Sequence, residues 1–136
     1  MTTSLSGHYL LDTHIILWAG LNPEKITESV KAAMSQPDAS FYVSATSVAE
    51  IACGVERGRI RLPVHWKSWF RDAVDRNGWT CLPMTLDIME EAYSLPGEFH
   101  PDPGDRVLVA TARVERLTLL TADTKILAYP HVASRG

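Results

Sequence analysis

The sequence has 136 residues, of which 46% are hydrophobic and 21% charged, and its formal net charge is −3. This length fits one domain, and this composition excludes a disordered or a collagen-like chain. The 13 basic and 16 acidic residues also exclude the overall positive field that is typical of a nucleic-acid-binding protein, so any contact with a nucleic acid must come from a local patch.

Short β-type runs alternate with amphipathic helical patterns along the chain. In chain order the patterns predict a strand over 8–11, helices over 13–20 and 26–34, a strand over 41–43, helices over 48–55 and 66–77, a strand over 79–82, helices over 85–94 and 107–114, a strand over 117–121 and a last strand near 131–133. Such alternation indicates a parallel sheet with helices on both faces, and short apolar runs indicate strands buried on both faces. The predicted fold is a single α/β domain over 1–136, a three-layer α/β/α sandwich with a short, mostly parallel sheet.

The sequence predicts neither a membrane segment nor a disulfide framework. The longest apolar run, residues 15–19, is too short to cross a bilayer, and residues 1–7 have neither the basic nor the apolar segment of a signal peptide, so we predict a cytoplasmic protein. Cys53 and Cys81 have no CxxC or Cys/His metal spacing, and we expect two buried, reduced thiols.

Acidic residues gather where the predicted strands end. Asp12 follows the first strand, Glu50 lies one turn into the helix after the second, and Asp123 follows the fourth. Asp105 lies in the first turn of the helix that leads into the fourth strand. Because ligands of parallel sheets bind beyond the carboxyl ends of the strands, these four side chains are candidates for one site.

Each acid also has a simpler structural interpretation. Asp12 and Asp123 can be helix N-caps, residues 47–50 match a capping box, and residues 102–105 match an N-cap followed by proline and an acid in the first turn. Caps do not require crowding, however, and two like charges 4 Å apart repel by about 4 kcal/mol at an effective dielectric of 20. Arg106 alone cannot balance four carboxylates, so raised pKa values or a bound cation must compensate.

A site of oxygen ligands without cysteine favours Mg²⁺ or Mn²⁺ over Zn²⁺. Magnesium commonly binds through carboxylates together with a substrate phosphate. The four acids therefore indicate metal-assisted hydrolysis of a phosphoryl or phosphodiester group.

Four sequence blocks resemble PIN-domain nucleases, specifically the VapC-type toxins of bacterial toxin–antitoxin pairs. The blocks are YLLDTH at 9–14, VSATSVAEI at 43–51, HPDPGDRVLVATA at 100–112 and LLTAD at 119–123, and together they span almost the whole chain. Two positions depart from the family pattern: Val48-Ala49 stands where Leu-Trp is frequent, and Gly104 stands where Phe is common. Neither departure removes an acid.

The resemblance implies a metal-dependent endoribonuclease with an α/β/α fold. The acidic quartet of the family falls on Asp12, Glu50, Asp105 and Asp123, which are expected to be both the catalytic residues and the ligands of Mg²⁺ or Mn²⁺. The expected products are a 5′-phosphate and a 3′-hydroxyl. The resemblance also implies a homodimer and a cognate antitoxin that wraps the toxin and brings a basic side chain near the acids.

Further polar residues are candidates for supporting roles. Candidates for orienting the ligands are Thr13, Thr121 and Asp102, although turn and capping chemistry is the simpler interpretation and N-capping is the preferred role of Asp102. Those expected to contact RNA phosphates, with a solvated face as the alternative, are Arg57, Arg59, Arg61, Arg106 and Arg113. His14 and His100 lie near acids in the sequence, but hard cations prefer oxygen, so we expect phosphate contact or a surface position for both.

Three other functions fit parts of this pattern. A signalling receiver domain has an acidic Mg²⁺ pocket, but it needs an acid after the third strand, where Pro83-Met84 stands. A phosphatase with an aspartyl nucleophile usually has a second Asp two residues on, where His14 stands. A non-catalytic binding module whose acids are all caps predicts no stabilisation by metal.

Overall fold

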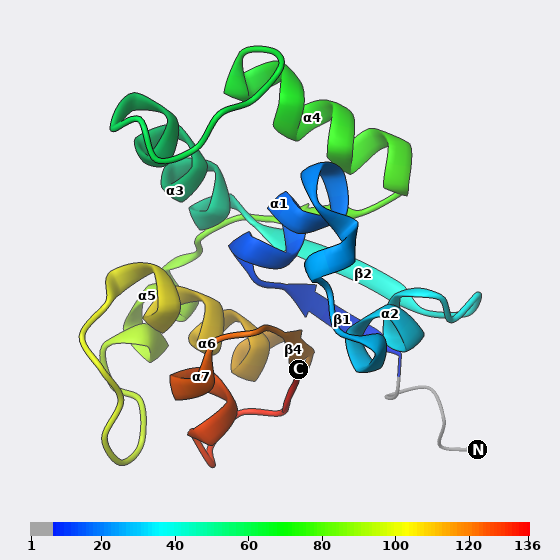
Figure 1. Ribbon diagram of the computed structural model, residues 1–136. Coiled ribbons are helices and arrows are strands. Elements are labelled where there is room, and N and C mark those ends of the chain that lie inside the picture. Colours follow the sequence, from blue (N-terminus) through cyan, green and yellow to red (C-terminus); the bar gives the residue numbers. More distant parts are fainter. Residues whose placement is uncertain (1–6) are drawn as a thin grey trace.

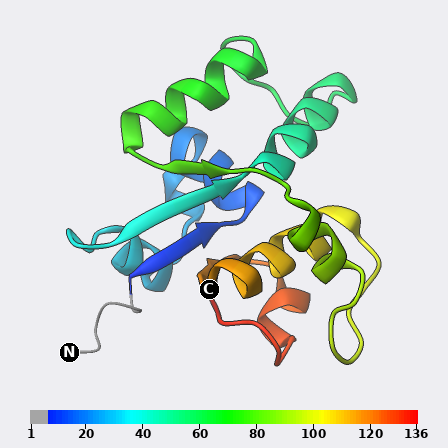
Figure 2. The same ribbon diagram turned by 180° about the vertical axis from the view of Figure 1, so that it is seen from behind.

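The computed structural model describes residues 7–136 and contains one five-stranded sheet. The strands are β1 (His8–Leu11), β2 (Ser40–Ser44), β3 (Thr80–Leu82), β4 (Thr118–Leu120) and β5 (Ser134–Arg135). They lie in the order β3-β2-β1-β4-β5, and each neighbouring pair is parallel (Figures 1 and 2). Residues 1–6, which carry most of the segment used to predict the absence of a signal peptide, lie outside the described residues.

Helices cover both faces of the sheet. They are α1 (Thr13–Leu21), the 3-10 helix η2 (Pro23–Lys25), α2 (Glu28–Met34), α3 (Ala45–Glu56), α4 (Trp66–Asn77), α5 (Leu86–Ala92), α6 (Pro103–Glu115) and α7 (Thr124–Ala128). Figure 1 shows α5, α6 and α7 on one side of the sheet and α1, α2 and α4 on the other. The predicted three-layer α/β/α fold with a parallel sheet is confirmed.

The side chains of β1 point alternately into two hydrophobic cores, one on each face of the sheet. Tyr9 and Leu11 point into the core that is shared with α1, α2, α3 and α4, whereas Leu10 points into the core that is shared with α6 and α7. Successive side chains of a strand face opposite sides of the sheet, so the three consecutive apolar residues 9–11 are buried from both faces. Leu10 and Leu11 are fully buried, and β1 is the central strand of the sheet.

Three local predictions are wrong. The last strand is Ser134–Arg135 rather than 131–133, because residues 130–132 form a turn and the ladder to β4 begins with the hydrogen bond from Leu119 N to Ala133 O, at 2.9 Å. Strand β3 is exposed rather than buried on both faces, because it pairs only with β2 at the edge of the sheet. Cys53 and Cys81 are exposed, so neither thiol belongs to the core.

Within residues 7–136, the longest apolar helices fall short of what a bilayer crossing requires.

Candidate active site

The site lies where β1 and β4 end side by side. Leu11 pairs with Leu120 in the register of these two strands, and the backbone N–H of Asp12 donates to Leu120 O at 3.0 Å. Both chains therefore leave the sheet at the same level. This carboxyl edge is the place where parallel sheets bind ligands, and Asp12 and Asp123 follow the two strands there.

Asp12 is buried, with 5% of its surface exposed. It occupies the N-cap position of α1, but its side chain makes no capping hydrogen bond, so the capping interpretation is wrong for this residue. Instead the hydroxyl of Thr121 donates to Asp12 Oδ2 at 2.5 Å. Burial raises the pKa of Asp12, and the hydrogen bond from Thr121 opposes that rise.

Glu50 reaches the site from the second turn of α3. The helix begins at Ala45 with Ser44 as its cap, so Ser47 lies inside the helix and the predicted capping box is absent. The hydroxyl of Thr13 donates to Glu50 Oε1 at 2.5 Å. Burial raises the pKa of Glu50, whereas the hydrogen bond from Thr13 lowers it.

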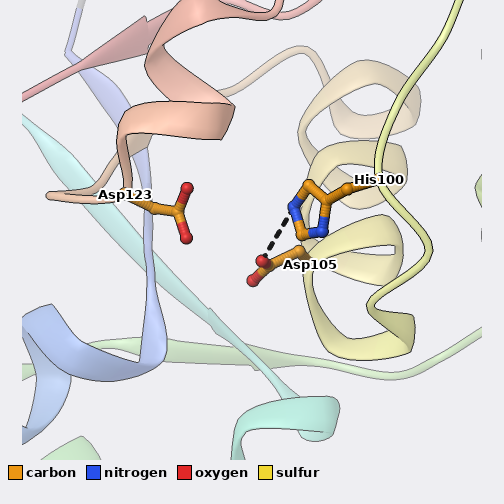
Figure 3. A group of neighbouring side chains, drawn as sticks. All are labelled: His100, Asp105 and Asp123. Carbon is orange, nitrogen blue, oxygen red and sulfur yellow. Dashed lines mark ion pairs between the residues drawn. The ribbon is translucent and has the colours of Figure 1, made fainter.

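The first turn of α6 carries Asp102 and Asp105. Asp102 is the N-cap of this helix and accepts a hydrogen bond from Asp105 N at 3.0 Å, so its predicted capping role is confirmed. The carboxylate of Asp105 is not used by the cap. It points towards Asp123 and His100, as Figure 3 shows. The nearest basic atom is His100 Nε2, 3.1 Å from Asp105 Oδ2.

His100 belongs to the site, beside two of the acids rather than on the surface. Its side chain is 17% exposed, so of the two predicted roles the surface position is wrong, whereas phosphate contact stays a prediction. Its Nε2 is buried and has no hydrogen bond of ordinary geometry within the described residues. One ligand atom from each of His100, Asp105 and Asp123 lies within 4.8 Å of the others (Figure 3). Only the proximity of His100 to the acids in the sequence could have indicated this placement.

Asp123 caps α7 and also faces the site. Its Oδ1 accepts hydrogen bonds from Lys125 N at 2.8 Å and from Ile126 N at 3.2 Å. Its own N–H donates to Thr121 Oγ1 at 3.0 Å, so Thr121 contacts both Asp12 and Asp123. Since the cap uses Oδ1, the other oxygen of Asp123 remains available to a ligand.

One cavity of about 520 Å³ joins all of these carboxylates. The acids that line it are Asp12, Glu50, Asp102, Asp105 and Asp123. Arg57 and Arg59, from the end of α3 and the turn after it, line the same cavity. The cavity therefore has an acidic part and a basic part, which suits a ligand that combines a cation with phosphate groups.

The acidic part carries an excess of negative charge. Burial, together with the carboxylates of Asp102, Asp12, Asp123 and Glu50, raises the pKa of Asp105 from 3.8 to about 7. Among the described residues no lysine or arginine forms an ion pair with these acids. Carboxylate oxygens are the ligands that hard divalent cations prefer, and Nε2 of His100, 3.1 Å from Asp105 Oδ2, adds one nitrogen ligand atom. The residues present therefore fit a divalent cation: one ligand atom from each of His100, Asp105 and Asp123 lies within 4.8 Å of the others, whereas Asp12 and Glu50 line the same cavity outside that group.

Three of the five candidate arginines lie away from this cavity. Arg106 donates to Ala92 O at 3.0 Å and to Phe99 O at 2.8 Å, which joins α6 to α5 and to the loop that carries His100. Arg113 donates to Glu91 at 2.6 Å and also bonds a backbone carbonyl. Arg61 is exposed and does not line the cavity. We therefore retain RNA contact only for Arg57 and Arg59.

The competing functions fit the topology less well. Receiver domains have the strand order 2-1-3-4-5, with the third strand inside the sheet. Here β3 is the edge strand, and no acid follows it directly. Capping explains Asp102 and Asp123 but not the buried carboxylate of Asp12, so an array of caps does not account for the site.

Comparisons with known proteins support a family assignment. Ribonuclease VapC22 of Mycobacterium tuberculosis is 29% identical over 122 residues, which cover 90% of this chain and 92% of that protein. The fold is similar to that of DNA-bound VapBC from Salmonella typhimurium, with a TM-score of 0.72, 14% identity and coverage of 94% of this chain and 96% of the other. VapBC2 from Rickettsia felis, bound to a promoter fragment, gives a TM-score of 0.69, 17% identity and coverage of 94% and 97%. The PIN domain family model matches residues 9–132. The chain thus belongs to the PIN domain family.

Proposed function

We propose that this protein is a divalent-metal-dependent endoribonuclease and the toxin of a toxin–antitoxin pair. The observation that carries the proposal is the group of buried or half-buried carboxylates at the carboxyl edge of the sheet, in which the pKa of Asp105 is raised to about 7. Such an arrangement is stabilised by a cation. The similarity to a protein named a ribonuclease supports RNA as the substrate.

In this proposal the acids have different roles. Asp12, Asp105 and Asp123 hold Mg²⁺ or Mn²⁺, and Glu50 is either a further ligand or the base that orients the attacking water. A divalent cation lowers the pKa of water and stabilises charge on phosphoryl oxygens. Thr121 and Thr13 hold Asp12 and Glu50 in place through hydrogen bonds.

The basic part of the cavity binds the RNA backbone. Arg57 and Arg59 contact phosphates next to the bond that is cleaved, which aligns the strand along the acids. Water attacks phosphorus in line with the leaving 3′-oxygen, so the products are a 5′-phosphate and a 3′-hydroxyl. The 2′-hydroxyl takes no part in the attack, and preference for RNA therefore comes from binding.

We further propose an antitoxin and a second copy of the chain as partners. Solved structures of similar fold are toxin–antitoxin complexes, which supports an antitoxin here. An apolar groove of about 590 Å³ along α4 offers a surface for such a partner. The groove is lined by Val48, Trp66, Lys67, Phe70, Arg71, Val74, Asp75 and Cys81. The cytoplasm, predicted from the sequence, is where both an antitoxin and RNA are available.

The direct test is cleavage of a mixed RNA pool by the purified protein with Mg²⁺, with Mn²⁺ and with EDTA. We expect metal-dependent cuts that leave 5′-phosphates, and we expect Asp12→Asn, Glu50→Gln and Asp105→Asn to abolish them while circular dichroism shows an intact fold. Undiminished cleavage by Asp12→Asn would refute the assignment. Light scattering of the purified chain tests the homodimer separately.

A further inference from the structure

Glu50 has the longest side chain among the acids of the site. This side chain has to be held in one conformation before its carboxylate can act on a cation. Its carboxylate ends a chain of three rotatable bonds, and immobilising such a side chain is entropically costly. The structure restrains it from two sides. Hydroxyl groups hold Oε1, and a helix without a side chain at the contact point lies against Oε2.

On the Oε1 side two hydroxyl groups form a chain. Thr13 Oγ1 donates to Glu50 Oε1 at 2.5 Å, and Ser47 Oγ lies 2.8 Å from Thr13 Oγ1. A hydroxyl has a single hydrogen, and that of Thr13 is given to the carboxylate. Ser47 must therefore be the donor to Thr13. Ser47 is fully buried and Thr13 is 5% exposed, so water does not replace either partner.

On the Oε2 side the contact is with Gly104 in the first turn of α6. A β-carbon at this position would lie 2.7 Å from Glu50 Cδ and closer still to Oε2. The backbone of Gly104 does not need glycine, because the described glycines with positive φ are at positions 7, 58, 78 and 97. The missing side chain at residue 104 therefore provides space, and the carboxylate of Glu50 fills it.

We infer that Ser47 and Gly104 are positioning residues of Glu50: the Ser47–Thr13 hydroxyl chain orients Oε1, and the bare backbone at Gly104 admits Oε2 to the start of α6 beside Asp105. The inference rests on the proposed function, because it assumes that Glu50 is a ligand of the cation or orients the attacking water. Both residues act through Glu50. Gly104 is one of the two positions that depart from the family pattern. In this chain the missing side chain leaves the space that the Glu50 carboxylate occupies.

The experiment compares Mn²⁺ affinity, measured by isothermal titration calorimetry on the full chain, in Gly104→Ala and Ser47→Ala, each with and without Glu50→Ala. We expect Gly104→Ala to weaken Mn²⁺ binding by about 10-fold to 100-fold, and Ser47→Ala to weaken it less. In the Glu50→Ala background each substitution should change the affinity by less than about twofold, because the group through which it acts is absent. Ser68→Ala, which removes an exposed hydroxyl from α4, is the control and should change nothing.

A crystal structure of the metal-free Gly104→Ala protein provides a readout that needs neither metal nor RNA. The Glu50 carboxylate should move away from α6 while α6 itself stays in place. An unmoved carboxylate, or equal losses of Mn²⁺ affinity with and without Glu50→Ala, would overturn the inference. If the wild-type protein binds Mn²⁺ but cleaves no RNA, the proposed function fails, while the calorimetry and the crystal structure still decide the role of Ser47 and Gly104.

Discussion

Thr121 and Asp12 lie 109 positions apart in the sequence, yet the hydroxyl of one donates to the buried carboxylate of the other at 2.5 Å. The bond joins the ends of β4 and β1, the two strands whose register brings the acids together. Thr121 also accepts the N–H of Asp123 at 3.0 Å. A single hydroxyl thus sets the relative positions of two acids of the candidate site.

Replacing Thr121 by Val should lower the stability and the metal affinity of the site without changing its shape. The substitution leaves the buried oxygen of Asp12 without its donor, which we expect to cost about 1–3 kcal/mol of stability and to lower metal affinity and RNA cleavage by about 10-fold to 100-fold. Thr121→Ser keeps the hydroxyl and should retain most of both. Thermal melts, calorimetry with Mn²⁺ and cleavage assays measure the three quantities, and equal behaviour of Val and Ser at this position would contradict the role of the hydrogen bond.

Metal-free protein should become less stable as pH rises towards neutrality. Burial and neighbouring carboxylates raise the pKa of Asp105 from 3.8 to about 7. Because the folded state binds this proton more tightly than the unfolded state, the stabilisation is fully present below about pH 4 and is lost as pH rises through about 7. The loss attributable to this group is at most about 4 kcal/mol.

Asp105→Asn is the control for this pH dependence, because an amide does not ionise. Chemical unfolding in EDTA between about pH 4 and pH 8, which includes the range over which the effect falls, should show a shallower pH dependence for the variant and greater stability than wild type at pH 8. The same dependence in both proteins would mean that Asp105 ionises freely in the fold.

Divalent metal should stabilise the protein through the same acids. At a Mn²⁺ concentration 100 times the dissociation constant, binding adds about 2.7 kcal/mol, which for a chain of this size raises Tm by roughly 10 °C. EDTA should reverse the shift. Asp123→Asn keeps an oxygen for the α7 cap but removes the charge, so its Tm should respond little to Mn²⁺. A metal response of wild-type size in this variant would exclude Asp123 as a ligand.

Arg57→Ala and Arg59→Ala should each weaken RNA binding in a salt-dependent manner. Each phosphate contact to a single strand contributes a slope of about −0.7 to the logarithm of affinity against the logarithm of salt concentration. Fluorescence anisotropy with single-stranded RNA, in an Asp12→Asn background that prevents cleavage, measures this slope. Arg76→Ala is the matched control, because Arg76 pairs with Asp72 on α4. If all three substitutions leave the same slope, neither Arg57 nor Arg59 contacts phosphate.

Arg106→Met should lower stability and leave the salt dependence of RNA binding unchanged. The guanidinium joins Ala92 O and Phe99 O, and Met keeps the apolar part of the side chain but donates to neither carbonyl. We expect a loss of about 2 kcal/mol in unfolding free energy. A reduced salt slope with full stability would instead support the RNA contact for which the sequence made Arg106 a candidate.

The sequence by itself determined the elements of the fold and the edge at which the acids meet. The apolar run from Tyr9 to Leu11 predicts a strand buried on both faces, and Asp12 follows this strand directly. The apolar spacing of α3 and α6 placed Glu50 and Asp105 near helix starts. These signals are local, since they depend on neighbours within one or two turns, and they remain readable without knowledge of the rest of the chain.

The tertiary structure decided how each polar group is used. Asp102 and Asp123 cap helices, whereas Asp12 is bound by Thr121 from another strand and Glu50 by Thr13 from another helix. The same long-range packing placed His100 beside Asp105 and committed Arg106 to backbone carbonyls. A buried polar group bonds to whichever partner the packing places against it, and partners distant in the sequence leave no periodic pattern from which they could be predicted.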